Sequence, residues 1–384
     1  RIFSRTYVKW SQILELSGIW GCFYVIRMIE QRLKCGNTRK CKKMSEVINQ
    51  KKERIDFLDY LKAICVIMVI ITHYDWSDKS TPFFTMLINM AVPVFMIISG
   101  YNFAMSNKKK TNGKFRKMYE WKFLKSKLIR FLVPFFTVCL IEIAILAVED
   151  KNINPFRIFV LGAYGPGSYY VPIMIQLLVI FPIIYKMVER SAKWGIFLSG
   201  MANLLFEICV IVFDMDKYYY RLSIGRYLLL IAFGCYLYLH PEHRLKKRQL
   251  ICMFFIGMSY IIAVYGLDKE FVIFGYWKTT AMPIAFYIFP IIVLFFRKFY
   301  HLTIPGSAGR LLTLIGQASY HIFLVQMVYY HFKLGGKIMS MPWYVAIPIN
   351  IVISVSIGIM FYKLDGQFIN MVRTYKYQRK VKVV

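Results

Sequence analysis

Ten long apolar runs, separated by short polar segments, constrain this chain more than any other feature. A helix of about 20 mostly apolar residues crosses a bilayer core of about 30 Å. None of the separators is long enough to hold a soluble domain, and the runs are too long and alternate too little for barrel strands. We therefore predict an all-α fold, a polytopic transmembrane helical bundle. The ten predicted spans are residues 57–74, 82–105, 130–148, 169–187, 194–213, 222–239, 249–267, 280–296, 311–332 and 343–362.

The composition also indicates a membrane protein. Apolar residues make up 58% and charged residues 18% of the 384 residues, and the mean hydropathy is +0.48. Soluble proteins have about 45–50% apolar and about 25% charged residues, so an ordinary cytosolic enzyme and a disordered chain are both poor fits. Most of the eight cysteines lie in apolar runs, and Cys35 and Cys41 have no partners at zinc-site spacing. We expect unpaired thiols and no metal site.

The basic residues alternate between the segments that join the spans. Of the 50 Lys and Arg residues, 35 lie in one alternate set of segments and 9 in the other. The basic set is 29–54, 106–130, 186–193, 240–248, 297–310 and the tail from 363. Under the positive-inside rule, this bias predicts a multi-pass protein of the cell (plasma or inner) membrane, with both ends of the ten-helix core in the cytoplasm. The net charge of +30 then faces membrane lipid, which argues against a nucleic-acid partner.

The chain outside these spans is predicted to be peripheral. Residues 10–28 are apolar but contain Glu15 and are flanked by Lys9 and Arg27, a pattern that favours an interfacial helix over an eleventh span. We predict three parts. They are an N-terminal interfacial helix with a basic cytoplasmic segment at 1–53, a ten-helix domain at 54–363 and a basic cytoplasmic tail at 364–384.

Ionisable side chains inside the first span point to a site, because charges in a bilayer are costly and mark function. Lys62 and His73 lie eleven positions apart, which leaves them about 20° apart around a helix and about 16 Å apart along it. Asp59 stands three residues before Lys62 and can pair with it. The alternative is that Lys62 snorkels to the inner interface and His73 is an ordinary interfacial histidine.

This span resembles the opening motif of the bacterial membrane-bound acyltransferase 3 family. In that family an Arg and a Leu-Asp pair precede a basic residue, ten intervening residues and a histidine, which here are Arg54, Leu58-Asp59, Lys62 and His73. Four later segments match the family in order, so that the resemblance covers roughly residues 54 to 362. They are Pro93 to Ser99-Gly100-Tyr101, Lys127 to Arg130 and Pro134, Ser168-Tyr169-Tyr170-Val171-Pro172, and Gly316 to Ser319-Tyr320 and Leu324.

Two positions depart from the family pattern. The late motif usually continues to a histidine where this chain has Gln326, and the fourth helix often has Trp where Tyr169 stands. A glutamine can donate and accept hydrogen bonds but does not titrate. We therefore assign no proton transfer to Gln326.

The resemblance implies transfer of an acyl group, usually acetyl, from a cytoplasmic acyl-CoA to a hydroxyl of a cell-envelope or exported polysaccharide. Acyl-CoA would be a donor substrate with no permanently bound cofactor, and the acceptor a glycan or a lipid-linked saccharide. His73 suits the general base, because histidine titrates near neutral pH. The CoA phosphates need cations on the inner side. The candidates are Arg54, Lys62, Lys125, Lys127 and Arg130, although Lys125 and Lys127 also fit inner-interface anchors.

The remaining candidates are less specific. Arg226, the other intramembrane cation, could stabilise an oxyanion in catalysis, bind an acidic glycan, or simply snorkel to outer headgroups. Glu142 and Glu207 could pair with Arg226 or with each other. The supporting residues are Asp59, Ser99, Tyr101 and Tyr320, of which the last three suit helix packing or hydrogen bonding better than nucleophilic attack.

Two other classes of membrane protein share some of these features. A transporter or export component for a glycan or lipid-linked intermediate would also use many spans, prolines near the midplane and buried charges. It should show internal repeats, which hydropathy does not reveal here. A sensory or structural membrane protein would leave the buried ions unexplained. The spacing of Lys62 and His73, together with the order of the motifs, favours the enzyme.

Overall fold

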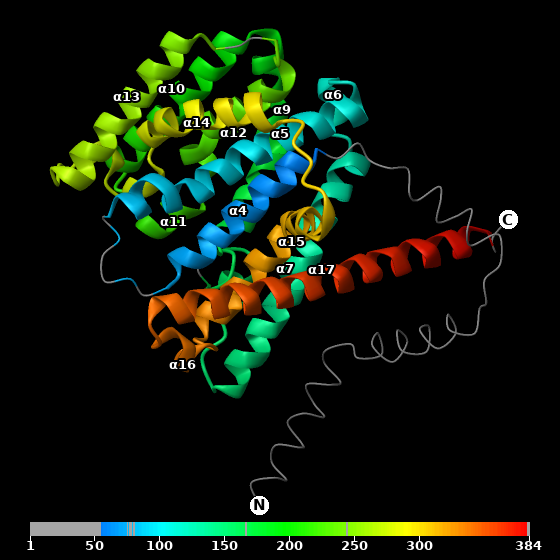
Figure 1. Ribbon diagram of the computed structural model, residues 1–384. Coiled ribbons are helices and arrows are strands. Elements are labelled where there is room, and N and C mark those ends of the chain that lie inside the picture. Colours follow the sequence, from blue (N-terminus) through cyan, green and yellow to red (C-terminus); the bar gives the residue numbers. More distant parts are fainter. Residues whose placement is uncertain are drawn as a thin grey trace, which may run out of the picture. The chain divides into compact units, whose positions relative to one another are not determined.

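A computed structural model describes residues 55–381, apart from residues 75, 77–78, 80, 166 and 243–244. All regular elements in this part of the chain are helices (Figure 1). The longer α-helices are α4 (Asp56–Thr72), α5 (Ala91–Thr111), α7 (Trp121–Val148), α9 (Tyr170–Arg190), α10 (Ala192–Val212), α12 (Leu228–Leu239), α13 (Lys247–Ile261), α14 (Met282–Phe299), α15 (Gly306–His331) and α17 (Trp343–Val381). The short α-helices are α6 (Phe115–Met118), α8 (Pro155–Phe159), α11 (Lys217–Leu222) and α16 (Gly336–Met339). Single turns of other helix types are η1 (Phe83–Leu87), η2 (Ile88–Met90), η3 (Ile224–Tyr227), η4 (Ile262–Gly266), η5 (Val272–Phe274) and η6 (Lys278–Thr280).

Each of the ten apolar runs forms one of the longer helices, which confirms the predicted helical bundle. Eight helices of the described chain are long and apolar enough to cross a membrane, so this is a multi-pass membrane protein. The other two are shorter: α4 has 17 residues, and η3 with α12 covers Ile224–Leu239. The last helix, α17, continues through most of the predicted basic tail to Val381. The predicted interfacial helix at 10–28 lies outside the described residues.

Local sequence explains where several helices begin. The side chain of Ser191 accepts a hydrogen bond from the backbone N–H of Trp194 at the start of α10, and Asp216 does the same for Tyr218 at the start of α11. Such N-caps satisfy donors that the helix itself leaves unpaired. At α8, Asn154 caps the helix and Pro155 follows it, where a missing N–H costs nothing.

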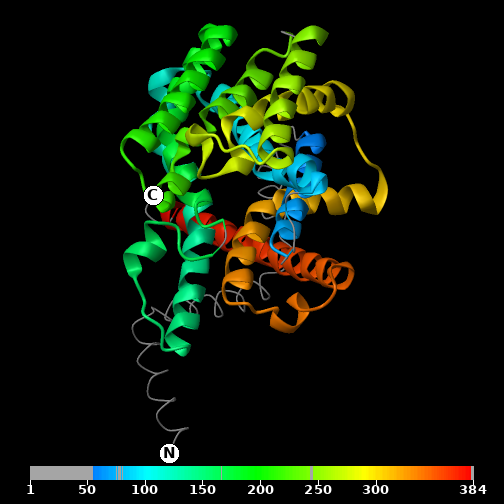
Figure 2. The same ribbon diagram turned by 90° about the vertical axis from the view of Figure 1, so that its left-hand side faces the viewer.

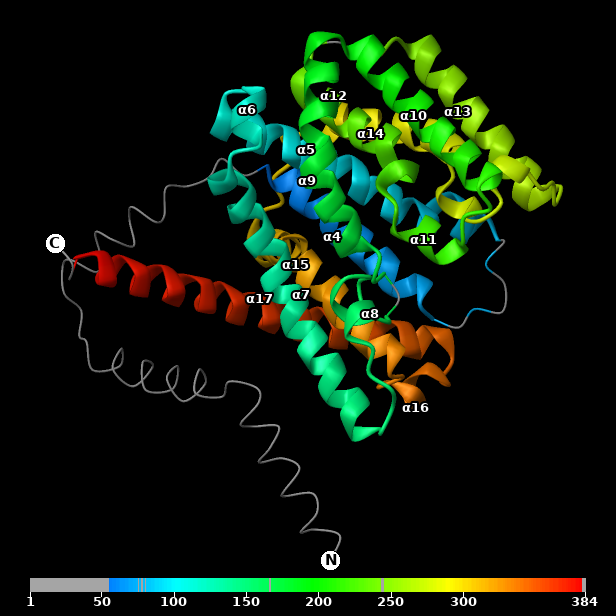
Figure 3. The same cartoon turned by 180° about the vertical axis from the view of Figure 1, so that it is seen from behind.

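Helix α4 lies inside the bundle, between α5 and α15 (Figures 1 and 2). Its residues contribute to two buried clusters. One contains Cys65 and Val69 with residues of α5, α12 and α14, and the other contains Ala63 and Val66 with residues of α15. By contrast, α7, α10, α13 and α17 leave most of their apolar spans exposed, as expected of helices that contact lipid. Figure 3 shows α7 and α17 crossing at the edge of the bundle.

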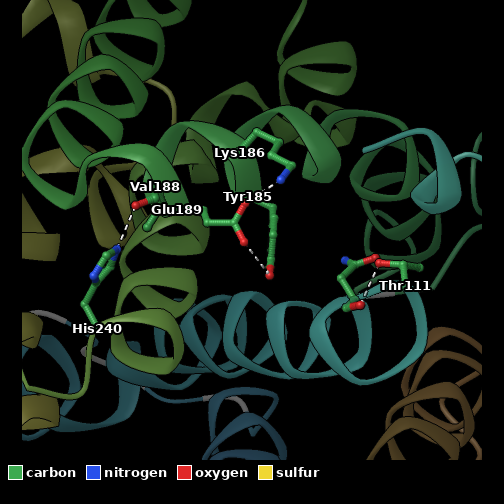
Figure 4. A network of polar contacts seen from close by, with 7 residues as sticks. Thr111, Tyr185, Lys186, Val188, Glu189 and His240 are labelled. Atoms are coloured by element: carbon green, nitrogen blue, oxygen red, sulfur yellow. Dashed lines mark hydrogen bonds and ion pairs between the residues drawn. The ribbon is translucent and has the colours of Figure 1, made fainter. Parts of the chain in front are cut away.

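The helix ends gather into two sets. We call one set the basic end. It contains the helix ends near residues 56–62, 106–127, 186–191, 240–242, 246–247 and 297–306. Figure 4 shows part of it: Glu189 of α9 accepts hydrogen bonds from Tyr185 (3.3 Å) and Lys186 (2.5 Å), and the His240 ring meets the Val188 carbonyl at 2.8 Å. The backbone N–H of Ile304 donates to the Tyr60 hydroxyl of α4 (3.1 Å).

The opposite end contains the helix ends near residues 72–82, 149–170, 213–227, 266–282 and 331–343. Tyr218 donates a hydrogen bond to the Leu161 carbonyl (3.4 Å), and Tyr74 donates to that of Met341 (3.0 Å). The loop before α9 packs closely against α15 without forming a helix. At Gly167 the contact is so close that an added Cβ would lie 2.3 Å from the Phe323 ring. Irregular backbone of this kind is tolerated in membrane proteins where protein encloses it.

Glycines bring α5 and α12 into backbone contact. A Cβ added at Gly100 would lie 2.1 Å from the carbonyl oxygen of Ile231, and one added at Gly234 would lie 1.9 Å from that of Ile97. Small residues allow this approach, and close packing holds helices together where lipid removes the hydrophobic drive for association. Gly100 of the Ser-Gly-Tyr segment therefore has a packing role.

We expect Gly100→Ala to lower the free energy of unfolding by about 1–3 kcal/mol, because the added methyl overlaps backbone that moves only with the helix. The matched control is Gly366→Ala in α17, where an added Cβ meets no atom within 4 Å. The control should keep or raise stability, since alanine favours helix. Thermal unfolding of both variants in detergent gives the comparison, and equal melting temperatures would contradict the packing role.

Candidate active site

The stripe of α4 that carries Lys62 and His73 faces the protein interior. Val66 and Val69 lie on either side of this stripe by helical geometry, and they belong to the clusters packed toward α15 and α5 respectively. The Lys62 side chain is 22% exposed, and His73 is half-buried. Both residues therefore point toward the seam between α5 and α15 and away from lipid.

Lys62 forms an ion pair with Asp59, as its spacing predicted. Asp59 is buried, and a Cβ added at Gly316 of α15 would lie 2.0 Å from the Asp59 carbonyl oxygen. The glycine of the late motif thus lets α15 contact α4 beside this pair. The buried carboxylate next to the ammonium fixes its position.

His73 ends α4 near the opposite end of the bundle. Its backbone N–H donates to the Ile70 carbonyl (3.1 Å), and its ring centroid lies 4.9 Å from that of Tyr330 in α15. The two ends of the stripe therefore both contact α15, through Gly316 and Tyr330. The same rigid helix holds the cation and the imidazole at their separate depths.

Tyrosines from separate family segments meet beside α15. The Tyr320 hydroxyl donates to the carbonyl of Phe131 in α7 (2.8 Å), and its ring lies 5.9 Å from that of Tyr170 in α9. The Tyr170 side chain is a hydrogen-bond partner of Ser99 in α5 and packs 5.3 Å from the ring of Phe323. We call these five residues the tyrosine core. It joins four of the five segments that carry the family resemblance.

The structure places three of the predicted donor-binding cations on α7. The Lys127 ammonium lies 3.8 Å from the ring centroid of Phe103 and 4.7 Å from that of Phe123, so this side chain folds onto α5. Lys125 and Arg130 are exposed. Arg54 lies outside the described residues.

A cavity of about 400 Å³ opens at the basic end, but Lys62 is not among the residues that form it. Its lining includes Asp56 and Tyr60 of α4 with Gly306, Arg310 and Gln317 of α15. Asp56 and Tyr60 lie more than about 90° around α4 from the Lys62 stripe. A passage that joins Lys62 with His73 therefore stays a prediction.

Tyr101 lies outside the tyrosine core. Its hydroxyl is 3.1 Å from that of Tyr300, and its ring packs 5.3 Å from that of Tyr238. It is buried between α5, α12 and the end of α14. These contacts suit packing at the basic end, the role that the sequence favoured.

Arg226 occupies a separate cluster at the opposite end. It is only 2% exposed, it bonds the Thr280 hydroxyl, and its guanidinium lies about 5 Å from three aromatic rings. No ion pair joins Arg226 to Glu142 or Glu207 among the described residues, although Glu207 lies near enough to interact with it electrostatically. Glu207 accepts a hydrogen bond from Tyr220 (3.1 Å), while Glu142 is buried in α7 beside the backbone of Tyr164 and Gly165.

One buried polar pair was not predicted from the sequence. His321 Nε2 lies 3.1 Å from an Asp365 carboxylate oxygen, which ties α15 to α17. No local pattern reveals this pair, because 44 residues separate its members. Gln326 is 1% exposed, and both polar atoms of its side chain lack a hydrogen-bond partner.

The fold and these contacts define a multi-pass membrane protein with an ordered polar interior around α4. The family model described as an acyltransferase domain, of the acyltransferase 3 type, matches residues 55–362. The chain therefore belongs to the acyltransferase 3 family and is an acyltransferase, which confirms the resemblance seen in the sequence. Comparisons with curated proteins and with solved structures gave no match.

We expect Tyr320→Phe to cost about 1 kcal/mol of unfolding free energy, because it removes only the hydrogen bond to the Phe131 carbonyl. Tyr320→Ala should cost about 3 kcal/mol or more, since it also empties the ring's place in the core. The exposed Tyr344→Phe serves as the control and should change nothing measurable. Chemical unfolding in detergent tests the order, and equal effects of Phe and Ala at 320 would contradict the packing described.

Proposed function

We propose that this acyltransferase moves an acyl group, acetyl in the first instance, from cytoplasmic acyl-CoA to a hydroxyl of a cell-envelope or exported polysaccharide. The basic end would face the cytoplasm of a plasma or inner membrane, in keeping with the charge bias. The observation that carries the proposal is the inward-facing stripe of α4, which holds a cation near one end of the bundle and an imidazole near the other.

His73 would act as the general base. In the transfer, the acceptor hydroxyl attacks the thioester carbonyl, the new C–O ester bond forms, and the C–S bond breaks. The hydroxyl proton passes to the imidazole, which can return it to the departing CoA thiolate. The contact between the rings of His73 and Tyr330 would hold the imidazole in place for both steps.

Lys62 would hold the donor on the cytoplasmic side, with Lys127 and Arg130 of α7 as further cations for the CoA phosphates. Arg54 remains a candidate from the sequence. Lys62 and His73 are about 16 Å apart along the axis of α4. A pantetheine arm is a flexible chain long enough to carry the thioester over that distance. In this arrangement the nucleotide stays at the basic end while the acyl group reaches His73.

Replacing His73 with Ala should abolish transfer while the protein stays folded, because a positioned general base contributes about 10²–10⁴-fold to rate. Purified protein would be incubated with labelled acetyl-CoA and a panel of envelope glycans, and label in the glycan fraction would be counted. His301→Ala, an exposed histidine at the basic end, should keep wild-type turnover.

The same assay separates the enzyme from a transporter. Label found in the glycan after wild-type incubation supports transfer chemistry. Glycan movement across vesicles without any label in the glycan would favour an export component instead. Wild-type turnover by the folded His73→Ala protein would remove the histidine from the mechanism.

Lys62→Ala should remove most activity through a rise of about tenfold or more in the KM for acetyl-CoA, the size expected for loss of one contact to a charged group. Lys62→Arg should recover part of it, because the positive charge and the pairing with Asp59 are kept. Lys114→Ala, which removes an exposed cation from the same end, is the control. An unchanged KM in Lys62→Ala would remove Lys62 from donor binding.

A further inference from the structure

Arg226 is a buried cation with no directly bonded carboxylate among the described residues. The buried Glu207 carboxylate interacts with it only at longer range, because it is hydrogen-bonded to Tyr220, whose ring lies against the guanidinium. Among the described residues, no Asp or Glu oxygen lies within ion-pair distance of its guanidinium, and its Nε has no hydrogen-bond partner. At 2% exposure it does not reach headgroups by snorkelling. Burying a guanidinium without a directly paired acid is unfavourable, which makes Arg226 a candidate for binding an external anion.

Aromatic rings surround this guanidinium. Its central carbon lies 4.8 Å from the ring centroids of Tyr220 and Tyr227 and 5.0 Å from that of Trp277. Cation–π contacts recover part of the desolvation cost. They leave the in-plane donors of the guanidinium available, which are the groups that grip a carboxylate or phosphate. Thr280 uses only one of these donors.

A second arginine, Arg221, lies next to this cluster and also has a buried Nε without a hydrogen-bond partner. Arg221 donates a hydrogen bond to the buried hydroxyl of Ser168 (2.5 Å). Its guanidinium carbon lies 5.8 Å from the ring centroid of Tyr169 and 5.7 Å from that of Tyr218. No described acid pairs with it either.

A third arginine connects these two with a surface cavity. Arg157 lies 4.2 Å from the ring centroid of Tyr164 and 5.7 Å from that of Tyr218, the ring it shares with Arg221. Arg157 and Tyr218 also line a cavity of about 190 Å³ with Asn154, Phe156 and Leu161. We call Arg157, Arg221 and Arg226 the arginine row. Arg157 lines the cavity, whereas Arg221 and Arg226 are not among its lining residues and lie behind the shared Tyr218 ring.

The row adjoins the tyrosine core through neighbouring residues of one chain segment. Ser168 bonds Arg221, Tyr169 lies beside Arg221 and Trp277, and Tyr170 belongs to the core. A ligand in the row would therefore reach toward the residues that carry the family resemblance. It would enter at the end opposite to the predicted donor cations.

We propose that the arginine row binds an oxyanion on the acceptor saccharide, so that this enzyme acylates an anionic glycan. The proposal rests on the proposed function in taking the acceptor to be a saccharide. Guanidinium groups would hold the charge, and the flat faces of Tyr169, Tyr218 and Trp277 would pack against sugar rings. A carboxylate of a uronic acid and a phosphate of a phosphodiester-linked or lipid-linked glycan share this chemistry.

Binding to the full-length protein in nanodiscs, measured by calorimetry without acyl-CoA, tests the proposal. The probes are a hyaluronan tetrasaccharide for the carboxylate, a glycerol phosphate oligomer for the phosphate, and neutral chitotetraose. We expect at least one anionic probe to bind about tenfold or more tightly than chitotetraose, as charge-assisted contacts would give. Whichever anionic probe binds identifies the source of the charge.

The variants are Arg226→Gln and Arg221→Gln, each expected to weaken binding of the anionic probe about tenfold or more. Lys217→Gln is the matched control, because it removes an exposed cation from the same short helix as Arg221. Should Arg226→Gln fail to fold, the half-buried Arg221 variant decides alone. Equal binding of neutral and anionic probes, no binding of any probe, or an equal loss in Lys217→Gln would overturn the proposal.

The outcome of this binding experiment is independent of the outcome of the transfer assay that tests the proposed function. Anionic probes that bind through the arginine row to a protein without transfer activity would contradict the acyl-transfer proposal and leave the anion site standing. Label transfer to neutral glycans by a protein that ignores the anionic probes would do the reverse.

Discussion

The structure depends on close backbone contact around α4 and α5, made possible by glycine. In a bilayer, lipid chains are as apolar as the helices, so association relies on packing and interhelical hydrogen bonds. Gly316 lets α15 touch α4 at Asp59, while Gly100 and Gly234 let α5 touch α12. These contacts enclose a helix of only 17 residues that carries an ion pair. Enclosure by protein is what allows the charges of Asp59 and Lys62 to exist at that depth.

The gathering of helix ends separates two kinds of chemistry. At the basic end, lysines and arginines lie on exposed helix ends or fold onto aromatic rings, as Lys127 does on Phe103. At the opposite end, arginines lie among tyrosine and tryptophan rings, and no described acid forms a direct ion pair with Arg221 or Arg226. Between these ends lies the tyrosine core, built from four chain segments. The proposed transfer, in which donor and acceptor bind at different ends of the bundle, would use this division.

Hydropathy and the family motifs could predict the fold and the first-helix stripe, because both depend on local sequence. Ten spans follow from ten apolar runs, and the pairing of Lys62 with Asp59 follows from a three-residue spacing in one helix. Contacts between residues far apart in the chain could not be predicted from local sequence. Arg226 bonds Thr280, 54 residues away, and His321 pairs with Asp365 in a segment that reads as a basic tail. The aromatic rings around Arg226 could not be predicted either, because they come from distant segments and carry no charge pattern in a sequence.

Helix α15 has a wider consequence for the geometry of the reaction. It holds Tyr330 against His73 and, through Phe323, supports the glycine loop that leads to Ser168 and Arg221. In the proposed mechanism, this one helix would set the distance between the His73 imidazole and a saccharide held by the arginine row. Relatives that take longer or shorter sugars would have to change this helix, or the loop seated on it, to keep the reacting hydroxyl in reach.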